Sequence, residues 1–384
     1  MISESSGTDP RDGPSARLPC ALVYYGARRH ADPGGLFGRS AARCASMPGW
    51  NNTRWSASAA TSVNVVAMML VEWLMDADPG IRWQAMRDLA DATAAEVGAE
   101  RARVATEGWG AQFLALQGAD GKWDGGTYRP GWVDDSKPFF DAWTATHFSL
   151  SLLRELGLEP ECPQARRAVM LVREKVLWEA NGAPYFEGET EPCINGIALA
   201  NAAYFGERGD AIVERLLAGE LGDGGWNCWA DHGAKVSSFH STMCVLEGLL
   251  AWERAGGSAN EVAAARRRGE EYLLARRLMR RRSTGRMVDP RFTMLSFPTY
   301  WYFDVLRGLE YFRSAGARPD DRLADAIAIV ASKRDEEGRW PLENAHQGPT
   351  HLEMEGPEGF PSRWNTLRAM RVLRWAVGGT GSRS

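Results

Sequence analysis

The sequence contains no hydrophobic run of the roughly 18 or more residues that a membrane-spanning helix needs. Its N-terminus shows no compact basic and apolar export signal. It also lacks an excess of positive charge, because its formal net charge is -4 and its pI is about 6.0. Without a positive field, nucleic acid is not an expected partner. We therefore expect a soluble protein that makes at most peripheral contact with a membrane.

Cysteine is sparse as well. The chain has 6 cysteines in 384 residues, at Cys20, Cys44, Cys162, Cys193, Cys228 and Cys244. This scattered spacing is not that of a disulfide framework, so a reducing, cytoplasmic environment is expected. The remaining composition, 44% hydrophobic and 24% charged, is ordinary for a globular protein. A chain of this size can bury a core large enough for an enzyme.

The first 64 residues differ from the rest of the chain. Residues 1–64 are rich in Gly, Ser, Ala, Arg and Pro and have no sustained apolar period, which predicts a disordered tail. The first periodic segment opens at Met68. We therefore expect a single folded domain over residues 65–378.

A short loop motif recurs along this domain. An acidic residue followed by Gly-x-Trp occurs in QGADGKWDGG, LGDGGWNCW and RDEEGRWPLE, and NGAPYFEGE is a degenerate copy with Tyr185 and Phe186. An apolar helix is expected after each loop, and the period of about fifty residues is typical of stacked helical hairpins. We expect the motif tryptophans, Trp123, Trp226 and Trp340, to lock these hairpins together and to stay out of the functional site.

The expected helices alternate in character. Charged helices such as QARRAVMLVREKVLW alternate with helices richer in small and aromatic residues, such as CINGIALANAAYFG. An outer and an inner position explain this difference. The predicted fold is therefore all-α, an α/α toroid of five or six helical hairpins with a central aromatic-lined cavity. The N-termini of the inner helices would share one rim, where helix dipoles and loop residues converge.

These motifs also carry a resemblance to known proteins. The segment FLALQGADGKW resembles the repeat of squalene and oxidosqualene cyclases, and the DGGW loop is similar to those of protein prenyltransferase β-subunits. The resemblance covers residues 97–376 as a pattern of repeats. It is specific for the fold and weak for the reaction. It implies an enzyme that acts on an isoprenoid or a similarly apolar small molecule.

The resemblance to prenyltransferases also implies a zinc site. In that family an Asp-x-Cys at the start of one inner helix and a His at the start of the next hold zinc. Here Glu191 and Cys193 open one predicted inner helix and His240 opens the next, in FHSTMCVLEGL. A carboxylate, a thiolate and an imidazole are zinc ligands that leave a fourth position open. Zinc there would lower the pKa of a bound thiol or water and create a nucleophile.

The resemblance to prenyltransferases also bears on diphosphate binding and on a partner subunit. The basic cluster that binds isoprenoid diphosphate in that family is reduced here to Lys235. A prenyltransferase also pairs with a second subunit, and the sequence identifies no surface for one. The alternative for the zinc residues is structural, because Cys193 can be a small buried residue and His240 a capped one beside Ser237 or Ser238.

Two other functions remain open. A metal-free class II terpene cyclase protonates its substrate with an aspartate, and Asp141 is the candidate acid because it lies near the start of an inner helix. Such an enzyme steadies cations with aromatic faces, and the candidate substrate-binding aromatic residues are Trp143, Phe239, Tyr300, Trp301, Phe303 and Trp364. The third function is a non-catalytic binding toroid. The loop ENAHQGPTHLEMEG holds His346, His351, Glu353 and Glu355, which form either a second metal cluster or, as the absence of a helical His pair or a cysteine favours, a solvated loop that caps the rim.

Overall fold

The computed structural model describes residues 68–90, 92–134 and 142–378. The expected tail at residues 1–64 and the candidate acid Asp141 lie outside these residues. Within them, none of the helices is long and apolar enough to cross a membrane.

Two sets of helices alternate along the chain. The first set consists of α3 (Pro79–Asp88), α6 (Thr146–Leu156), α8 (Pro192–Tyr204), α10 (Phe239–Arg254), α12 (Val305–Ser314) and α14 (Arg363–Gly378). The second set consists of α4 (Ala94–Ala102) with α5 (Gly108–Ala115), α7 (Pro163–Lys175), α9 (Asp210–Ala218), α11 (Asn260–Leu274) and α13 (Ala324–Ser332). A helical segment at 68–75 precedes α3.

Short elements lie in the connections. Five 3-10 turns occur among the described residues, namely η1 (Arg103–Ala105), η2 (Tyr185–Glu187), η3 (Ala230–His232), η4 (Pro290–Thr293) and η5 (Asp321–Leu323). The strands β1 (Trp340–Pro341) and β2 (Pro361–Ser362) form an antiparallel pair on either side of the loop that precedes α14.

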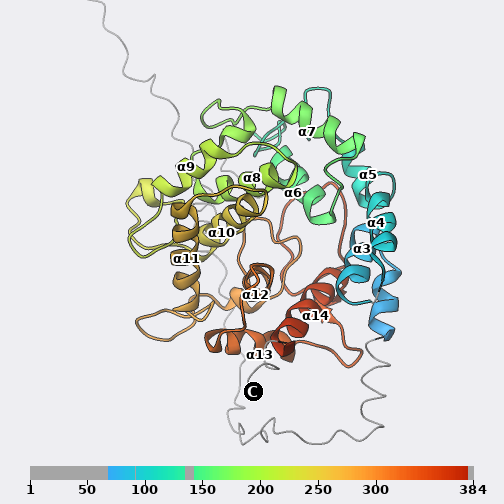
Figure 1. The fold of residues 1–384 in the computed structure, drawn as a ribbon, viewed down its shortest axis with the longest axis vertical. Helices are drawn as coiled ribbons and strands as arrows, with labels where there is room; N and C mark the ends of the chain where they lie inside the picture. Colours follow the sequence, from blue (N-terminus) through green and yellow to red (C-terminus); the bar gives the residue numbers. More distant parts are fainter. Residues whose placement is uncertain (1–67, 91, 135–141, 379–384) are drawn as a thin grey trace, which may run out of the picture.

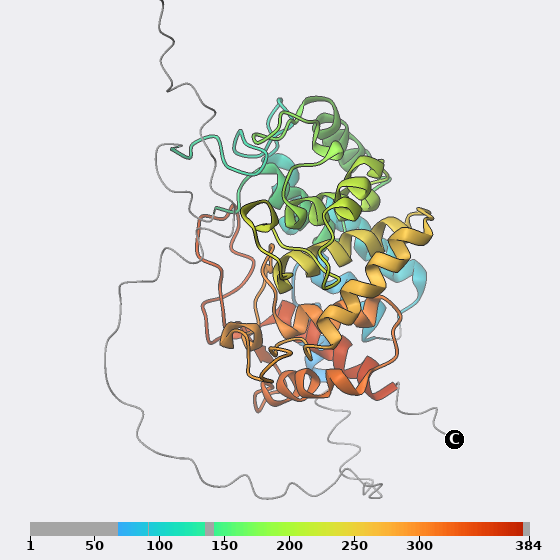
Figure 2. The same ribbon diagram turned by 90° about the vertical axis from the view of Figure 1, so that its left-hand side faces the viewer.

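The first set of helices forms an inner ring and the second set surrounds it (Figure 1). The helices α3, α6, α8 and α10 contact one another in turn, and α12 contacts α14, which contacts α3. An ion pair between Glu247 on α10 and Arg307 on α12, 2.6 Å long, joins the two remaining neighbours. The predicted α/α toroid is therefore confirmed. In the side view, the long connections before α6 and α14 lie on the same face of the ring (Figure 2).

The motif tryptophans join neighbouring hairpins, as the repeat predicts. Trp123, Trp226 and Trp340 are buried, and each indole Nε1 donates a hydrogen bond of 2.6 to 2.7 Å to a carbonyl of the preceding outer helix. The backbone N–H of each tryptophan donates to a threonine hydroxyl in the first turn of the following inner helix. One residue thus ties an outer helix to the next inner helix. Because these bonds are buried, each loop is held at a fixed position on the rim.

The inner helices α8 and α10 approach each other closely. A Cβ atom at Gly196 would lie 2.3 Å from the carbonyl oxygen of Cys244, and a Cβ atom at Gly248 would lie 2.3 Å from the carbonyl oxygen of Gly196. No other residue type fits at these positions without moving the backbone. The close contact fixes the starts of α8 and α10 relative to each other, and the candidate site lies there.

Caps and backbone angles set two helix boundaries near the inner ring. The helix α12 begins at Val305, because the Asp304 side chain caps it by accepting a hydrogen bond from the Arg307 N–H. The helix α11 ends at Leu274, and Arg277 and Leu278, which follow it, have positive φ angles of 46° and 62° that do not continue a helix.

Candidate functional site

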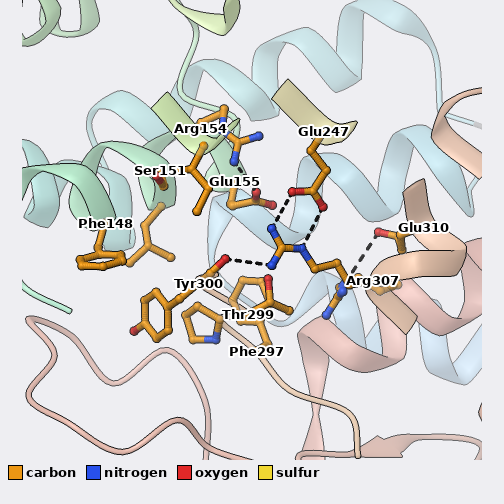
Figure 3. Close-up of a pocket in the computed structure, with 14 residues that line it drawn as sticks. Phe148, Ser151, Arg154, Glu155, Glu247, Phe297, Thr299, Tyr300, Arg307 and Glu310 are labelled. Carbon is orange, nitrogen blue, oxygen red and sulfur yellow. Dashed lines mark hydrogen bonds and ion pairs between the residues drawn. The ribbon is translucent and has the colours of Figure 1, made fainter. Parts of the chain in front are cut away.

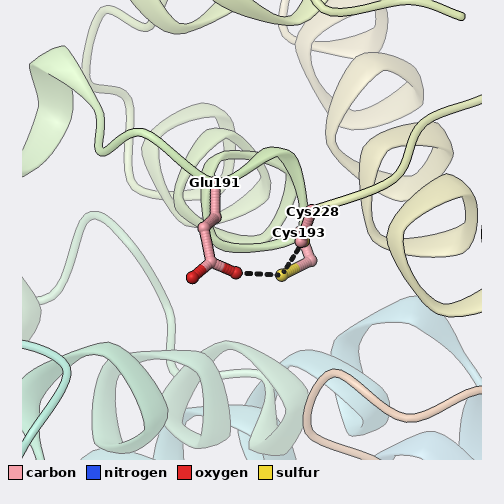
Figure 4. Close-up of side chains that lie close together, drawn as sticks. All are labelled: Glu191, Cys193 and Cys228. Carbon is pink, nitrogen blue, oxygen red and sulfur yellow. Dashed lines mark hydrogen bonds between the residues drawn. The ribbon is translucent and has the colours of Figure 1, made fainter. Parts of the chain in front are cut away.

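Three side chains that can bind a metal meet at the rim of the ring, at the start of α8. They are Glu191, the N-cap of α8, Cys193, the second residue of α8, and Cys228, in the loop between α9 and α10. One donor atom from each lies within 4.8 Å of the other two. The Cys193 Sγ atom is 3.7 Å from Glu191 Oε2 and 2.8 Å from Cys228 Sγ (Figure 4).

The local sequence explains why these residues meet. Pro192 occupies the first position of α8, where a missing N–H costs nothing, so the helix starts directly after Glu191. The Glu189 carboxylate accepts a 2.6 Å hydrogen bond from the Glu191 N–H and holds the chain before the helix. Cys228 follows the locked Trp226 by two residues, and its N–H donates to Ser241 Oγ at 3.3 Å, which joins the loop to α10.

The donor set fits zinc. Two thiolates and a carboxylate are ordinary zinc ligands, and three protein ligands leave one position open, as in catalytic zinc sites. Tetrahedral ligands at 2.0 to 2.3 Å from zinc lie about 3.3 to 3.8 Å apart. The 3.7 Å separation of Glu191 and Cys193 matches this spacing, whereas the two sulfur atoms would have to separate by about 1 Å.

Without a cation, the environment of this group keeps the Cys228 thiol protonated. Cys193 is buried, and Glu191 and Cys228 are half-buried. Burial raises the pKa of the Cys228 thiol, and nearby Glu191 adds to that rise. A bound divalent cation reverses this balance, because it stabilises thiolates.

His240 is not part of this group. It lies at the second position of α10, and its Nδ1 atom accepts a 2.8 Å hydrogen bond from the Phe303 N–H. Its ring lies among those of Phe292, Trp301 and Tyr302. Burial lowers the pKa of His240 to about 3. The structure therefore places Cys228, and not His240, beside Glu191 and Cys193.

The reason lies in helix geometry. Successive helical residues point about 100° apart. The Ser241 hydroxyl lies 3.3 Å from Cys228 Sγ, which contacts Cys193 at the start of α8. The adjacent His240 points instead toward the loop before α12, where it contacts Phe303. Sequence spacing alone does not show which of two adjacent residues points toward the neighbouring helix. The signal that could have identified Cys228 is the repeat itself, because GGWNCW places a cysteine two residues after the rim-locking Trp226.

The predicted substrate-binding aromatic residues are packed against each other. Trp143 stacks on Tyr300 with ring centroids 4.0 Å apart, and Phe239 packs against Phe303 at 5.3 Å. Trp301 stacks on the neighbouring Tyr302 at 3.7 Å, and Trp364 stacks on Phe297 at 4.3 Å. These rings are part of the core in this conformation.

Lys235 lies apart from these rings. It is exposed, in the loop that precedes α10.

A small cavity lies inside the inner ring (Figure 3). Its volume is about 100 Å³, and it is bounded by α6, α8, α10, α12, α14 and the loop at 297–300. The aromatic residues Phe148, Phe297 and Tyr300 contribute to its wall, as the sequence predicts for a central cavity. The sequence did not predict its six charged side chains, which are Arg154, Glu155, Glu247, Arg307, Glu310 and Arg368.

The loop between β1 and β2 covers part of the rim, as expected. The Trp143 backbone N–H donates to the Pro349 carbonyl at 2.9 Å, and its indole N–H donates to the Gln347 carbonyl at 3.0 Å. His346 is buried in this loop and stacks on Tyr302, with centroids 3.9 Å apart. The loop thus covers the stacked pair of Trp143 and Tyr300.

Glu355, in the same loop, is a buried carboxyl group with a raised pKa. Its Oε1 atom accepts hydrogen bonds from Ser362 Oγ at 2.6 Å and from the Trp364 N–H at 3.2 Å, at the start of α14. Burial nevertheless raises the pKa of Glu355 to about 7. A large part of Glu355 is therefore a neutral carboxylic acid at neutral pH. The sequence did not indicate this, because the change comes from burial in the folded protein.

This chain is only weakly similar to known proteins. No family model and no curated protein matches it. Among solved structures it is similar to a protein from Actinoplanes, with 15% identity over 82% of this chain and 99% of that chain and a TM-score of 0.42. It is also similar to the type II terpene cyclase MstE from Scytonema, with 15% identity over 83% of this chain and 98% of that chain and a TM-score of 0.41.

Proposed function

We propose that this chain is an enzyme that acts on an isoprenoid or a similarly apolar substrate at a zinc centre on the inner-helix rim. Glu191, Cys193 and Cys228 are the proposed ligands. The observation that carries the proposal is the approach of their donor atoms to within 4.8 Å of one another. They come from two different repeats, and the tryptophan bonds and the close packing of α8 and α10 hold them together.

The residues around the proposed centre would have distinct roles in holding and orienting the metal ligands. Zinc, when bound, would supply a Lewis acid that lowers the pKa of a thiol or water at its open position. Glu191 and the two cysteines would hold it at the mouth of α8, and the Glu189 carboxylate fixes the backbone before Glu191. The Ser241 hydroxyl, which contacts Cys228 Sγ, would orient that ligand. The chain thus keeps one side of the centre fixed and leaves the other for substrate.

Exposed apolar side chains on the rim loops support an apolar substrate. Trp132, Leu177 and Val236 are 50%, 50% and 60% exposed. They belong to the connections that lead into α6, α8 and α10, and the last two of these connections also carry Glu191 and Cys228. A hydrocarbon chain would gain free energy by covering these side chains.

A second candidate function is a metal-free cyclase, and Glu355 favours it. Such a reaction needs a carboxylic acid that stays protonated near neutral pH. The pKa of about 7 gives Glu355 this property, and it lies at the start of α14 beside Trp364. In this alternative, Glu355 takes the role that the sequence assigns to Asp141.

One experiment separates these candidates. Purified protein, either loaded with zinc or treated with a chelator, is incubated with squalene or with an isoprenyl diphosphate and a small thiol, and products are measured by mass spectrometry. The zinc proposal predicts product that is lost on chelation and in Cys228→Ala but kept in Cys162→Ser, a matched change at the start of α7. Product that survives chelation and disappears in Glu355→Gln supports the cyclase. No product under any condition contradicts both and supports a binding toroid.

A further inference from the structure

The central cavity holds more charge than packing requires. Three arginine and glutamate pairs face it, with N···O distances of 3.0 Å for Arg154 and Glu155, 2.6 Å for Arg307 and Glu247, and 3.8 Å for Arg368 and Glu310. Well-packed apolar side chains would stabilise a toroid core as well as such pairs do. The Arg154 and Glu155 pair is partly exposed, but Arg307 and Arg368 are buried, and these two buried charges call for a role other than stability.

One of the three pairs is a scaffold. The Arg307 guanidinium donates to both carboxylate oxygens of Glu247, at 2.9 and 2.6 Å. It also donates to the carbonyl oxygen of Tyr300 at 3.0 Å (Figure 3) and to that of Tyr302 at 2.6 Å. These bonds use its donors and hold the loop at 297–302 against α12. Arg307 therefore shapes the cavity and has little capacity left for a ligand.

The other two arginines have donors to spare. Arg154 donates from Nε to Asn201 and from Nη2 to Glu155, and its Nη1 atom has no hydrogen-bond partner within residues 68–90, 92–134 and 142–378. Arg368 is 7% exposed and donates from Nη1 to the Ser296 carbonyl. The Arg368 Nη2 atom has no such partner in the described chain. The Arg368 Nε atom lies 3.8 Å from Glu310 Oε2, which is longer than a hydrogen bond.

The loop that borders the cavity adds a third donor and a strained backbone. The Thr299 hydroxyl lines the cavity and has no hydrogen-bond partner among the residues that the structure describes. The next residue, Tyr300, has a φ of 47°, in the left-handed region that residues other than glycine seldom adopt. Strain of this kind persists where the surroundings enforce it, and it gathers at ligand sites.

We propose that this cavity binds a small organic carboxylate that carries a branched hydrocarbon group. The carboxylate would accept hydrogen bonds from Arg154, Arg368 and Thr299, since charged donors of this kind favour a carboxylate. The hydrocarbon would pack on the apolar part of the wall, which is formed by Phe148, Leu152, Ile197 and Phe297. A volume of about 100 Å³ holds only a few carbon atoms beside the carboxylate. The three glutamates oppose an anion of higher charge, such as a phosphate or diphosphate.

Isothermal titration calorimetry with 3-methylbutanoate and the full chain tests this proposal. We expect one saturable site per chain. Arg154→Gln and Arg368→Gln should each weaken binding about tenfold or more, because each removes a charged donor. Thr299→Val keeps the side-chain shape and should weaken binding several-fold. Arg173→Gln, which removes an exposed arginine on α7 that pairs with Glu207, should leave binding unchanged.

Other outcomes would overturn the proposal. The absence of saturable heat in the native chain contradicts it, as do unchanged affinities in both Arg154→Gln and Thr299→Val. Equal binding of the neutral 3-methylbutanol would show an apolar cavity without carboxylate recognition, and tighter binding of inorganic phosphate would show a different anion site. Binding that persists in Cys228→Ala supports a site independent of the metal centre, so this test does not depend on the proposed function.

Discussion

Replacement of His147 by phenylalanine should change how stability depends on pH. His147 is fully buried at the start of α6, among the rings of Tyr128, Phe148, Trp178 and Tyr185. Its Nδ1 atom lies 3.1 Å from the Tyr185 hydroxyl. Burial lowers the pKa of His147 from 6.5 to about 3, so the folded protein keeps this imidazole neutral.

The sign and size of the effect follow from this shift. As the pH falls below 6.5, the unfolded chain binds a proton at His147 and the folded chain does not, so the folded state loses stability. The contribution is complete above pH 6.5 and is lost progressively as the pH falls toward 3. Each pH unit in this window costs about 1.36 kcal/mol, so the cost at pH 5.0 is about 2 kcal/mol. Phenylalanine does not titrate and escapes this cost.

Urea unfolding followed by tryptophan fluorescence at pH 7.5 and 5.0 measures the effect. At pH 7.5, His147→Phe should be about 1 kcal/mol less stable than the native chain, because the hydrogen bond to Tyr185 is lost. The difference in unfolding free energy between variant and native chain should then shift by about 2 kcal/mol in favour of the variant at pH 5.0. His232→Gln, at an exposed position, is the control. A difference that stays constant between the two pH values would refute the reasoning.

Two further changes test the packing of the inner ring. Gly196→Ala should destabilise the protein by about 3 kcal/mol, because the new Cβ would lie 2.3 Å from the Cys244 carbonyl oxygen. Gly98→Ala on α4, where a Cβ would meet nothing within 4 Å, should stabilise it by up to about 1 kcal/mol. Equal effects of the two alanines in thermal unfolding would contradict the close contact of α8 and α10. Glu247→Ala should cost about 3 to 5 kcal/mol because it leaves Arg307 buried without its carboxylate. Glu261→Ala, at an exposed position, should lower the free energy of unfolding by less than about 1 kcal/mol. Equal losses for Glu247→Ala and Glu261→Ala in urea unfolding would show that the pair of Glu247 and Arg307 does not stabilise the ring.

Much of the fold could be predicted from periodic features of the sequence. The Gly-x-Trp loops recur because each tryptophan makes the same two bonds, from its indole to an outer helix and from its backbone to an inner one. The alternation of charged and small-residue helices reflects exposure on the outside and close packing inside. Both signals depend on local sequence, so they can be recognised without knowledge of the three-dimensional arrangement.

The features that could not be predicted depend on which side chains meet across the ring. The aromatic run before Asp304 has helical composition, but the Asp304 cap and the bonds from Arg307 to two loop carbonyls hold it as a loop. Glu191 and Cys193 could be placed at a helix start from sequence. Whether Cys228 or His240 joins them depends on the direction of side chains on α10, which spacing does not encode.

The central claim is a metal centre made of Glu191, Cys193 and Cys228, and metal content tests it most directly. Purified protein is measured by plasma mass spectrometry for the native chain and for Cys193→Ala, Cys228→Ala and His240→Ala, with the fold of each checked by circular dichroism. We expect close to one zinc per chain in the native protein and in His240→Ala, and its loss in both cysteine variants. Zinc that disappears in His240→Ala but stays in Cys228→Ala, or a native chain without zinc after reconstitution, would contradict it.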